Sequence, residues 1–132
     1  CADADHQVLQ GVTVEDTVHV IARHEKIMAS YCLNQYQAPN EVSLTLVCQE
    51  GTVRFEMHQN RWCWMRRTEE PWQTEVHALG RDTLFTKEAH AFLDFLEDKA
   101  DPLCSLKEGI QSLKVNLAIL KASRERTWQG VE

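Results

Sequence analysis

The sequence predicts an α+β domain with an open, mostly antiparallel sheet of about six strands and two C-terminal helices packed on one face. Short segments between residues 14 and 78 alternate apolar and polar residues, as strands do when one face is buried. The links between these segments are short, which favours antiparallel pairing of successive strands. Beyond residue 84 the apolar spacing changes to that of amphipathic helices.

Turn signals separate the expected strands. Residues 24–26 form a short polar link and residues 35–40 a longer polar loop, while Gly51 and Asn60 suit tight turns. Alternation then places strands at residues 14–23, 27–34, 42–48, 52–57, 62–64 and 72–78. One set of alternate residues is strongly apolar and is expected to face the helices: Leu44, Leu46, Val53, Phe55, Trp62 and Trp64.

Two helices are expected after the strands, over residues 85–96 and from residue 105 onward. An Asp-Pro pair at residues 101–102 breaks the helical pattern between them. Ser105 and Glu108 have the spacing of a capping box. Gly109 costs about 1 kcal/mol relative to alanine in a helix, which indicates close packing at that point. The apolar stripes are Phe85, Ala89, Phe92, Leu93 and Leu96, then Leu106, Ile110, Leu113, Leu117 and Leu120.

The composition is that of an ordinary globular chain of 132 residues, which fits a single domain. A net charge of −6 argues against a nucleic-acid partner, and no apolar run approaches the roughly 20 residues that span a membrane. The five cysteines are widely spaced and the histidines are scattered, so neither a disulfide framework nor a metal site is predicted. Reduced thiols and the lack of a secretory segment predict a cytoplasmic protein.

The chain starts at Cys1 without an initiator methionine, and we therefore expect it to be the back half of a larger protein.

Two helices can cover only one face of the sheet. The other face, of roughly 600 Å², is close to one partner's share of a standard interface and carries several large apolar side chains, among them Met28, Val47 and Met65. We expect this face to self-associate. The alternative is a wet face with a few stray apolar residues.

The most unusual polar segment is the loop after the second expected strand. Its amide side chains both donate and accept hydrogen bonds, which suits a polyhydroxylated ligand, although such turns are also common structural features. The candidate residues, near a substrate or a subunit boundary, are Asn34, Gln35, Gln37 and Asn40.

Two other groups are interpreted as structural. Asp3, Asp5 and His6 could bind a metal or move protons, but the start of a strand is the simpler interpretation. Trp62 and Trp64 lie among arginines, yet they alternate toward the apolar face and are expected in the core.

Several short stretches occur in one order along nearly the whole chain: Val14-Glu15-Asp16-Thr17, Asn34-Gln35, Glu50-Gly51-Thr52-Val53, Ala89-x-x-Phe92-Leu93-Asp94, Asp101-Pro102-Leu103-Cys104-Ser105-Leu106-x-x-Gly109 and Leu113-x-Val115-x-x-Ala118. Together they resemble the C-terminal domain of the Gfo/Idh/MocA family, the relatives of glucose–fructose oxidoreductase and inositol dehydrogenase. The ending from Ala89 to Gly109 is the most specific part.

The resemblance implies a two-domain oxidoreductase. An N-terminal Rossmann domain, absent from this chain, would hold NAD or NADP on a glycine-rich turn. The C-terminal domain would close the substrate site and make subunit contacts through its free sheet face. The implied reaction is hydride transfer between the nicotinamide and a sugar-like or cyclic polyol substrate.

The chain departs from the family pattern in three motifs. It has no G-x-G-x-x-G, no Glu-Lys-Pro and no Asp-x-x-x-His, and Asp3-x-x-His6 has the wrong spacing for the last. No catalytic, cofactor-binding or metal-binding residue is therefore assigned to it, and the isolated chain is expected to be inactive and to bind no cofactor. One alternative is a non-catalytic ligand-binding or protein-interaction domain of the same fold. Another is a small hydrolase or isomerase that uses Asp3 and His6.

Overall fold

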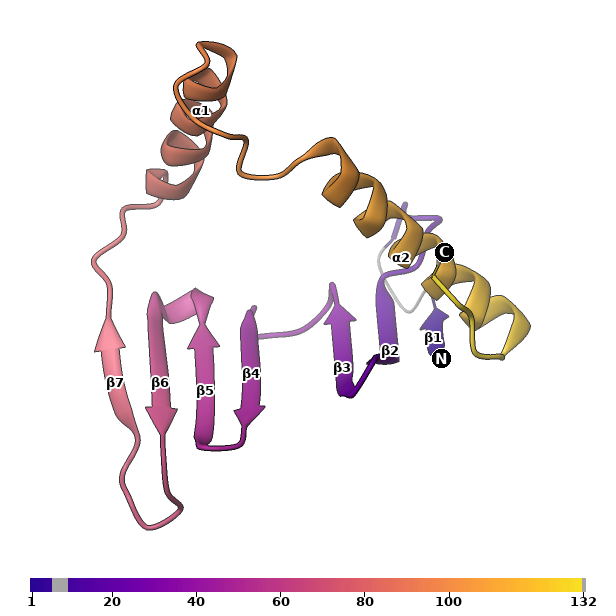
Figure 1. Cartoon of the computed structure of the whole chain (residues 1–132). Helices are drawn as coiled ribbons and strands as arrows, with labels where there is room; N and C mark the ends of the chain where they lie inside the picture. Colours follow the sequence, from indigo (N-terminus) through magenta and orange to yellow (C-terminus); the bar gives the residue numbers. More distant parts are fainter. Residues whose placement is uncertain (6–9, 132) are drawn as a thin grey trace. The chain divides into compact units, whose positions relative to one another are not determined.

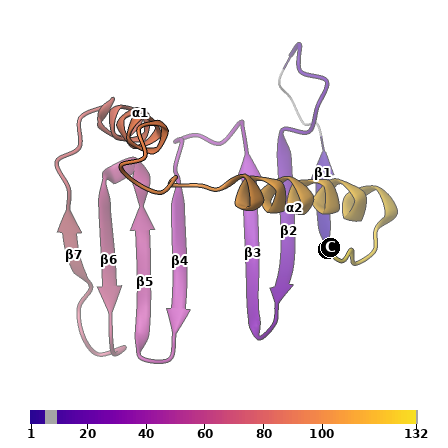
Figure 2. The ribbon, with the colours of Figure 1, turned by 45° about the horizontal axis from the view of Figure 1, so that its top comes forward.

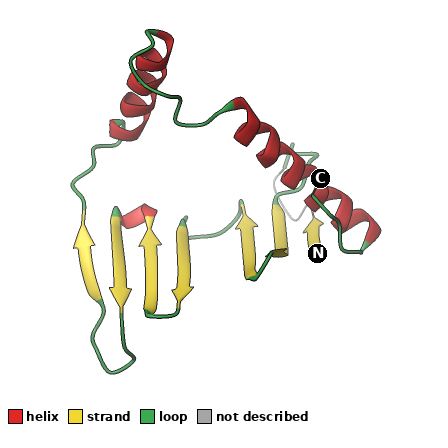
Figure 3. Ribbon diagram, in the orientation of Figure 1, coloured by secondary structure: helices red, strands yellow, loops and turns green. Residues whose placement is uncertain are grey.

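The computed structural model describes residues 1–5 and 10–131, which form two compact units (Figure 1). The first unit combines Cys1–Tyr36 with Cys104–Glu132, and the second is Gln37–Leu103. Each unit contains one antiparallel sheet and one long helix, shown in yellow and red in Figure 3.

The first unit has a three-stranded sheet in the order β1-β2-β3. Strand β1 is Ala2–Asp5, β2 is Thr17–His24 and β3 is Ile27–Asn34. Both pairings are antiparallel, and the register aligns Ala2 with Val20 and Val20 with Tyr31. Helix α2, Leu106–Glu125, runs across one face of this sheet (Figure 2).

Small side chains let helix α2 approach the sheet closely. Ala2, Val20 and Ala122 are buried together, and Val18 and Ile119 pack against them. The backbone N–H of Ala4 also donates to the Ser123 hydroxyl at 3.0 Å. This core is small, and its residues come from both ends of the sequence. The stability of the first unit therefore depends on contacts between those two ends.

The start of α2 confirms the predicted capping box. The Ser105 hydroxyl accepts from the Glu108 backbone N–H at 3.3 Å, and the Glu108 carboxylate accepts from the Ser105 N–H at 2.8 Å. The helix ends where Arg126 adopts a left-handed conformation with φ of 52°. The close packing expected at Gly109 is absent among the described residues, because a Cβ built there would meet nothing within 4 Å.

The second unit has a four-stranded antiparallel sheet in the order β4-β5-β6-β7. Strand β4 is Ser43–Cys48, β5 is Gly51–Glu56, β6 is Arg61–Met65 and β7 is Gln73–Val76. A short 3₁₀ turn, Met57–Gln59, joins β5 to β6, and helix α1, Thr83–Leu96, follows β7.

The pairing register of the second sheet confirms the predicted apolar row. Leu44 lies opposite Phe55, which lies opposite Trp62, and Val53 lies opposite Trp64. Phe55 stacks on Trp62 with ring centroids 6.0 Å apart, and Trp62 lies 4.9 Å from Trp64. Aromatic neighbours on one sheet face stabilise the pairing of their strands.

The structure supports only part of the predicted architecture. The α+β class, the antiparallel meander and both helices are confirmed, but a single sheet of about six strands is not. The prediction that both helices cover the sheet is also not confirmed. Only α2 packs extensively on described strands, whereas α1 has no buried residue and Leu44 and Leu46 remain 47% and 45% exposed.

Candidate functional site

The amide loop begins where β3 ends. The Asn34 side-chain oxygen accepts a hydrogen bond from the Tyr36 backbone N–H at 2.8 Å, which stabilises a turn. The Gln35 backbone N–H donates to the Asp16 carbonyl at 2.9 Å and extends the β2–β3 pairing by one step. The Asn34 side-chain oxygen is therefore engaged within the turn. Asn34 and Gln35 are both exposed to solvent.

The boundary between the two units falls inside this predicted cluster. Asn34 and Gln35 belong to the first unit, whereas Gln37 and Asn40 belong to the second. Both residues of the second unit are exposed and lie outside regular structure, on either side of a cis peptide bond between Ala38 and Pro39. A shared role for the four amides stays a prediction.

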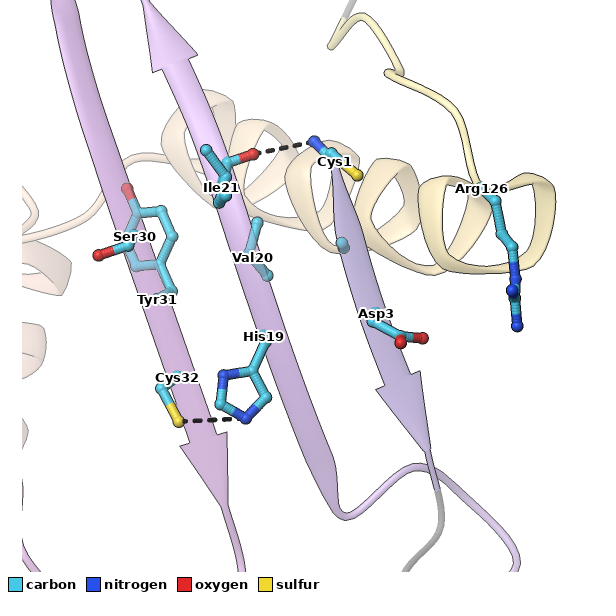
Figure 4. Close-up of a pocket in the computed structure, with 10 residues that line it drawn as sticks. Cys1, Asp3, His19, Val20, Ile21, Ser30, Tyr31, Cys32 and Arg126 are labelled. Carbon is cyan, nitrogen blue, oxygen red and sulfur yellow. Dashed lines mark hydrogen bonds between the residues drawn. The ribbon is translucent and has the colours of Figure 1, made fainter.

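A shallow depression of about 610 Å³ lies on the first sheet (Figure 4). Alternate side chains on the sheet face opposite α2 supply most of its polar groups, because Asp3, His19 and Cys32 are cross-strand neighbours in the pairing register. The full lining is Cys1, Ala2, Asp3, His19, Val20, Ile21, Ser30, Tyr31, Cys32 and Arg126.

One chemically notable pair lies in this depression. The His19 Nε2 atom is 3.7 Å from the Cys32 sulfur, and both residues are accessible to solvent. Figure 4 shows the imidazole ring directed at the thiol, while Arg126 lies at the far end of α2. An imidazole can accept a thiol proton, so the pair can support thiol reactivity. The neighbouring Asp3 carboxylate accepts a hydrogen bond from the Ala4 backbone N–H at 3.1 Å through one of its oxygens.

The remaining sequence candidates carry no site in the described structure. Asp3 and Asp5 lie on β1, as the strand interpretation predicted, while His6 lies outside the described residues. No group of three metal-ligating side chains comes together within residues 1–5 and 10–131. Over the same residues, neither helix combines the length and the apolarity that a membrane crossing requires.

The second sheet holds a polar network on the face opposite its aromatic row. The Glu56 carboxylate pairs with the Arg61 guanidinium, and the buried Cys63 thiol lies 3.8 Å from the same carboxylate oxygen. The Thr74 hydroxyl reaches the Cys63 sulfur at 3.4 Å. The hydrogen bond from Arg61 holds the pKa of Glu56 below its usual value of 4.5, with smaller contributions from the charges of Arg61, Arg54 and His58.

This network predicts an acid-sensitive contribution to stability. Because the pKa of Glu56 is lowered by folding, the contribution is complete above the unfolded value of 4.5 and is lost as the pH falls through the folded value. Arg61→Ala should lower the urea midpoint at pH 7, and the difference from the parent chain should vanish near about pH 3. Lys99→Ala, which removes the exposed partner of Glu97, is the matched control and should change little at either pH. A constant difference for Arg61→Ala across this range would contradict the prediction.

The aromatic row of the second sheet borders a smaller hollow of about 330 Å³. Val53, Trp62 and Trp64 line it, and the Trp62 indole N–H donates to the Glu75 carboxylate at 2.9 Å. The row is only partly covered, so its aromatic faces are available for contact with other protein segments.

Sequence reasoning missed the structural role of Asp16. Its side chain is 1% exposed, and its Oδ1 atom accepts from the Thr17 hydroxyl at 3.0 Å. Its backbone N–H donates to the Asp5 carbonyl at 3.1 Å, and its own carbonyl accepts from Gln35. Asp16 thus joins the ends of β1, β2 and β3 beside the amide loop. The only signal in the sequence was its place in the stretch Val14-Glu15-Asp16-Thr17.

The fold is similar to that of a solved oxidoreductase. The crystal structure of an oxidoreductase domain protein from Kribbella flavida matches with a TM-score of 0.80 and 19% sequence identity. The match covers 92% of this chain and 39% of that chain, so this chain spans about two fifths of its neighbour's length. No protein-family model and no curated protein matches the sequence. At this identity the likeness establishes the fold alone.

Proposed function

We propose that this chain is the C-terminal, substrate-side domain of a cytoplasmic NAD(P)-dependent oxidoreductase of the Gfo/Idh/MocA family, acting on a sugar-like or polyol substrate. The observation that carries this proposal is the fold likeness: 92% of the chain matches 39% of an oxidoreductase domain protein. The resemblance of the short sequence stretches points the same way and was found independently of the fold.

The described residues do not fit a nicotinamide cofactor, which supports a cofactor site on a different domain from this one. A dinucleotide is held where a parallel strand turns through a glycine-rich loop into a helix. Every strand pair described here is antiparallel, and the segment before α1 contains only Gly80. In the proposed enzyme a separate N-terminal Rossmann domain holds the cofactor, and this chain shapes the substrate site.

The amide side chains are the proposed contribution to that site. Asn34, Gln35, Gln37 and Asn40 are solvent-accessible, and amides suit the paired donor and acceptor groups of sugar hydroxyls. Because Asn34 already bonds to Tyr36 through its oxygen, its amide N–H groups remain the donors that it can offer a hydroxyl.

The outer faces of the sheets are the proposed subunit contact. On the first sheet, Ile21 and Met28 are 52% and 66% exposed on the face opposite α2. Large apolar side chains that face solvent on one sheet face favour burial against another molecule.

The decisive experiment uses the full-length protein encoded by the gene. It should reduce NAD or NADP with at least one member of a panel of cyclic polyols and sugars, and residues 1–132 alone should not. Alanine at Asn34 and Gln35, then at Gln37 and Asn40, should raise KM or shift the oligomeric state. If the full-length protein showed no activity with either cofactor on any member of the panel, the enzyme proposal would be overturned. A ligand-binding or protein-interaction domain would then be favoured. Unchanged KM and unchanged subunit number in both double variants would leave the loop as a structural turn.

A further inference from the structure

A cysteine and a histidine lie side by side on the face of the first sheet that is opposite α2. Cys32 on β3 is the antiparallel partner of His19 on β2, so the two side chains leave the sheet on the same face. The His19 Nε2 atom and the Cys32 sulfur are 3.7 Å apart, as the dashed line in Figure 4 marks. Because both residues lie inside eight-residue strands, the pairing of β2 with β3 holds them together.

Among the described cysteines, Cys32 alone is exposed beside an imidazole. Cys63 is buried. Cys1, Cys48 and Cys104 are exposed, but no imidazole of a described histidine lies within hydrogen-bonding distance of their sulfur atoms. Cys32 therefore combines access from solvent with a neighbouring base, which is the arrangement of a reactive thiol.

The neighbouring imidazole suits thiol–disulfide exchange, because the thiolate is the attacking species. As the Cys32 sulfur attacks a disulfide, the His19 Nε2 atom can take up the thiol proton. One new S–S bond forms at Cys32, the S–S bond of the reagent breaks, and the imidazole returns the proton to the departing thiolate. Cys32 is thereby oxidised and one half of the reagent is reduced, so the disulfide itself is the oxidant.

The surroundings of the pair indicate the kind of disulfide. The depression above the pair has a volume of about 610 Å³, within the range of about 300–1,000 Å³ of small-molecule sites. Its lining includes the exposed Arg126, whose guanidinium can pair with a carboxylate of the reagent. Ser30 adds a hydroxyl group on the same face as Cys32. An open, polar depression with a guanidinium favours a small anionic peptide disulfide of the glutathione type.

We propose that the His19–Cys32 pair is a thiolation site for small disulfides of the glutathione type, and that the adduct blocks self-association of this sheet face. The second part rests on the proposed function, which places a subunit contact here. Ile21 and Met28, the exposed apolar residues of that contact, lie on the same two strands and the same face. An adduct at Cys32 places charged groups among them, and burial of unpaired charge is costly. Thiolation and association therefore compete for one face.

Adduct formation in the full-length protein tests the site, with oxidised glutathione as the probe. Peptide mass spectrometry measures the rate at each cysteine in dilute protein at pH 7. Cys32 should react at least about tenfold faster than Cys48 and Cys104, as general-base assistance predicts, and His19→Gln should remove this advantage. His24→Gln, on the same strand but the other face, is the matched control and should change nothing. Equal rates at these cysteines in the parent protein would overturn the proposal, whether or not the His19 variant folds.

Sedimentation velocity tests the competition with subunit contact. The rate at Cys32 should fall as the protein concentration rises and the oligomer forms, and the purified adduct should sediment as a single subunit. Cys32→Ser, treated in the same way, should remain oligomeric. A fast adduct that leaves the oligomer intact would overturn the proposed block of association. NAD(P) turnover is scored separately: thiolation without turnover would refute the enzyme proposal alone, and turnover with equal cysteine rates would refute the thiolation site alone.

Discussion

Replacing Gly51 by alanine should destabilise the second unit by about 3 kcal/mol, which is a large part of the stability of a small unit. Gly51 is the first residue of β5 and has a φ of 150°, a backbone conformation that residues other than glycine rarely adopt. A Cβ placed there would lie 2.3 Å from the Met65 carbonyl oxygen and 2.9 Å from the Arg66 Cα. Both contacts are with backbone on the neighbouring strand β6 and beyond, so relief requires separation of the β5–β6 pair.

Urea unfolding followed by tryptophan fluorescence measures this effect directly, because Trp62 and Trp64 lie on the affected strand β6. Gly109→Ala is the matched control. Its Cβ meets nothing within 4 Å, and alanine favours a helix over glycine, so this variant should be neutral or more stable by up to about 1 kcal/mol. If both variants shifted the midpoint equally, the clash at Gly51 would not be the cause.

Asp16→Ala should cost the first unit about 3 kcal/mol. Asp16 is buried at 1% exposure and its carboxylate accepts from the Thr17 hydroxyl, so the alanine would leave that partly buried hydroxyl without its charged acceptor. The loss acts where Asp5, Asp16 and Gln35 bring three strand ends together. The amide loop should therefore become less ordered, and exchange at the Gln35 N–H should accelerate.

Asp16→Asn separates charge from shape at this position. The amide keeps one acceptor oxygen and nearly the same volume, so it should retain part of the lost stability. Asp94→Ala, on the exposed surface of α1, should change the unfolding free energy by less than about 0.5 kcal/mol. A loss at Asp16→Ala no larger than that at Asp94→Ala would contradict the role assigned to the buried carboxylate.

Local patterns in the sequence were sufficient for most of the secondary structure. Alternation located β3 to within a residue, and the Ser105–Glu108 spacing gave the start of α2. Both signals arise from neighbours in sequence, namely side-chain alternation along a strand and reciprocal bonds within one helical turn. The aromatic row of Phe55, Trp62 and Trp64 was predictable for the same reason.

Long-range features were not predictable in this way. A strand start was expected near Asp3 and Asp5, but the Ala-Asp-Ala-Asp sequence of β1 does not reveal its partners, β2 and α2. The division of the strands into two sheets, the exposure of α1 and the burial of Asp16 depend on partners far along the chain. The amide loop is placed residue by residue, but its ligand is still a prediction.

The discontinuous make-up of the first unit has a consequence for biosynthesis. Its sheet and its covering helix are joined by contacts such as that between Ala4 and Ser123, 119 positions apart. A nascent chain emerging from the ribosome must therefore hold β1, β2 and β3 without their helix until Leu106–Glu125 has been translated, whereas Gln37–Leu103 can form its own contacts earlier. During that interval the early strands are the part of the molecule with the greatest need for chaperone protection.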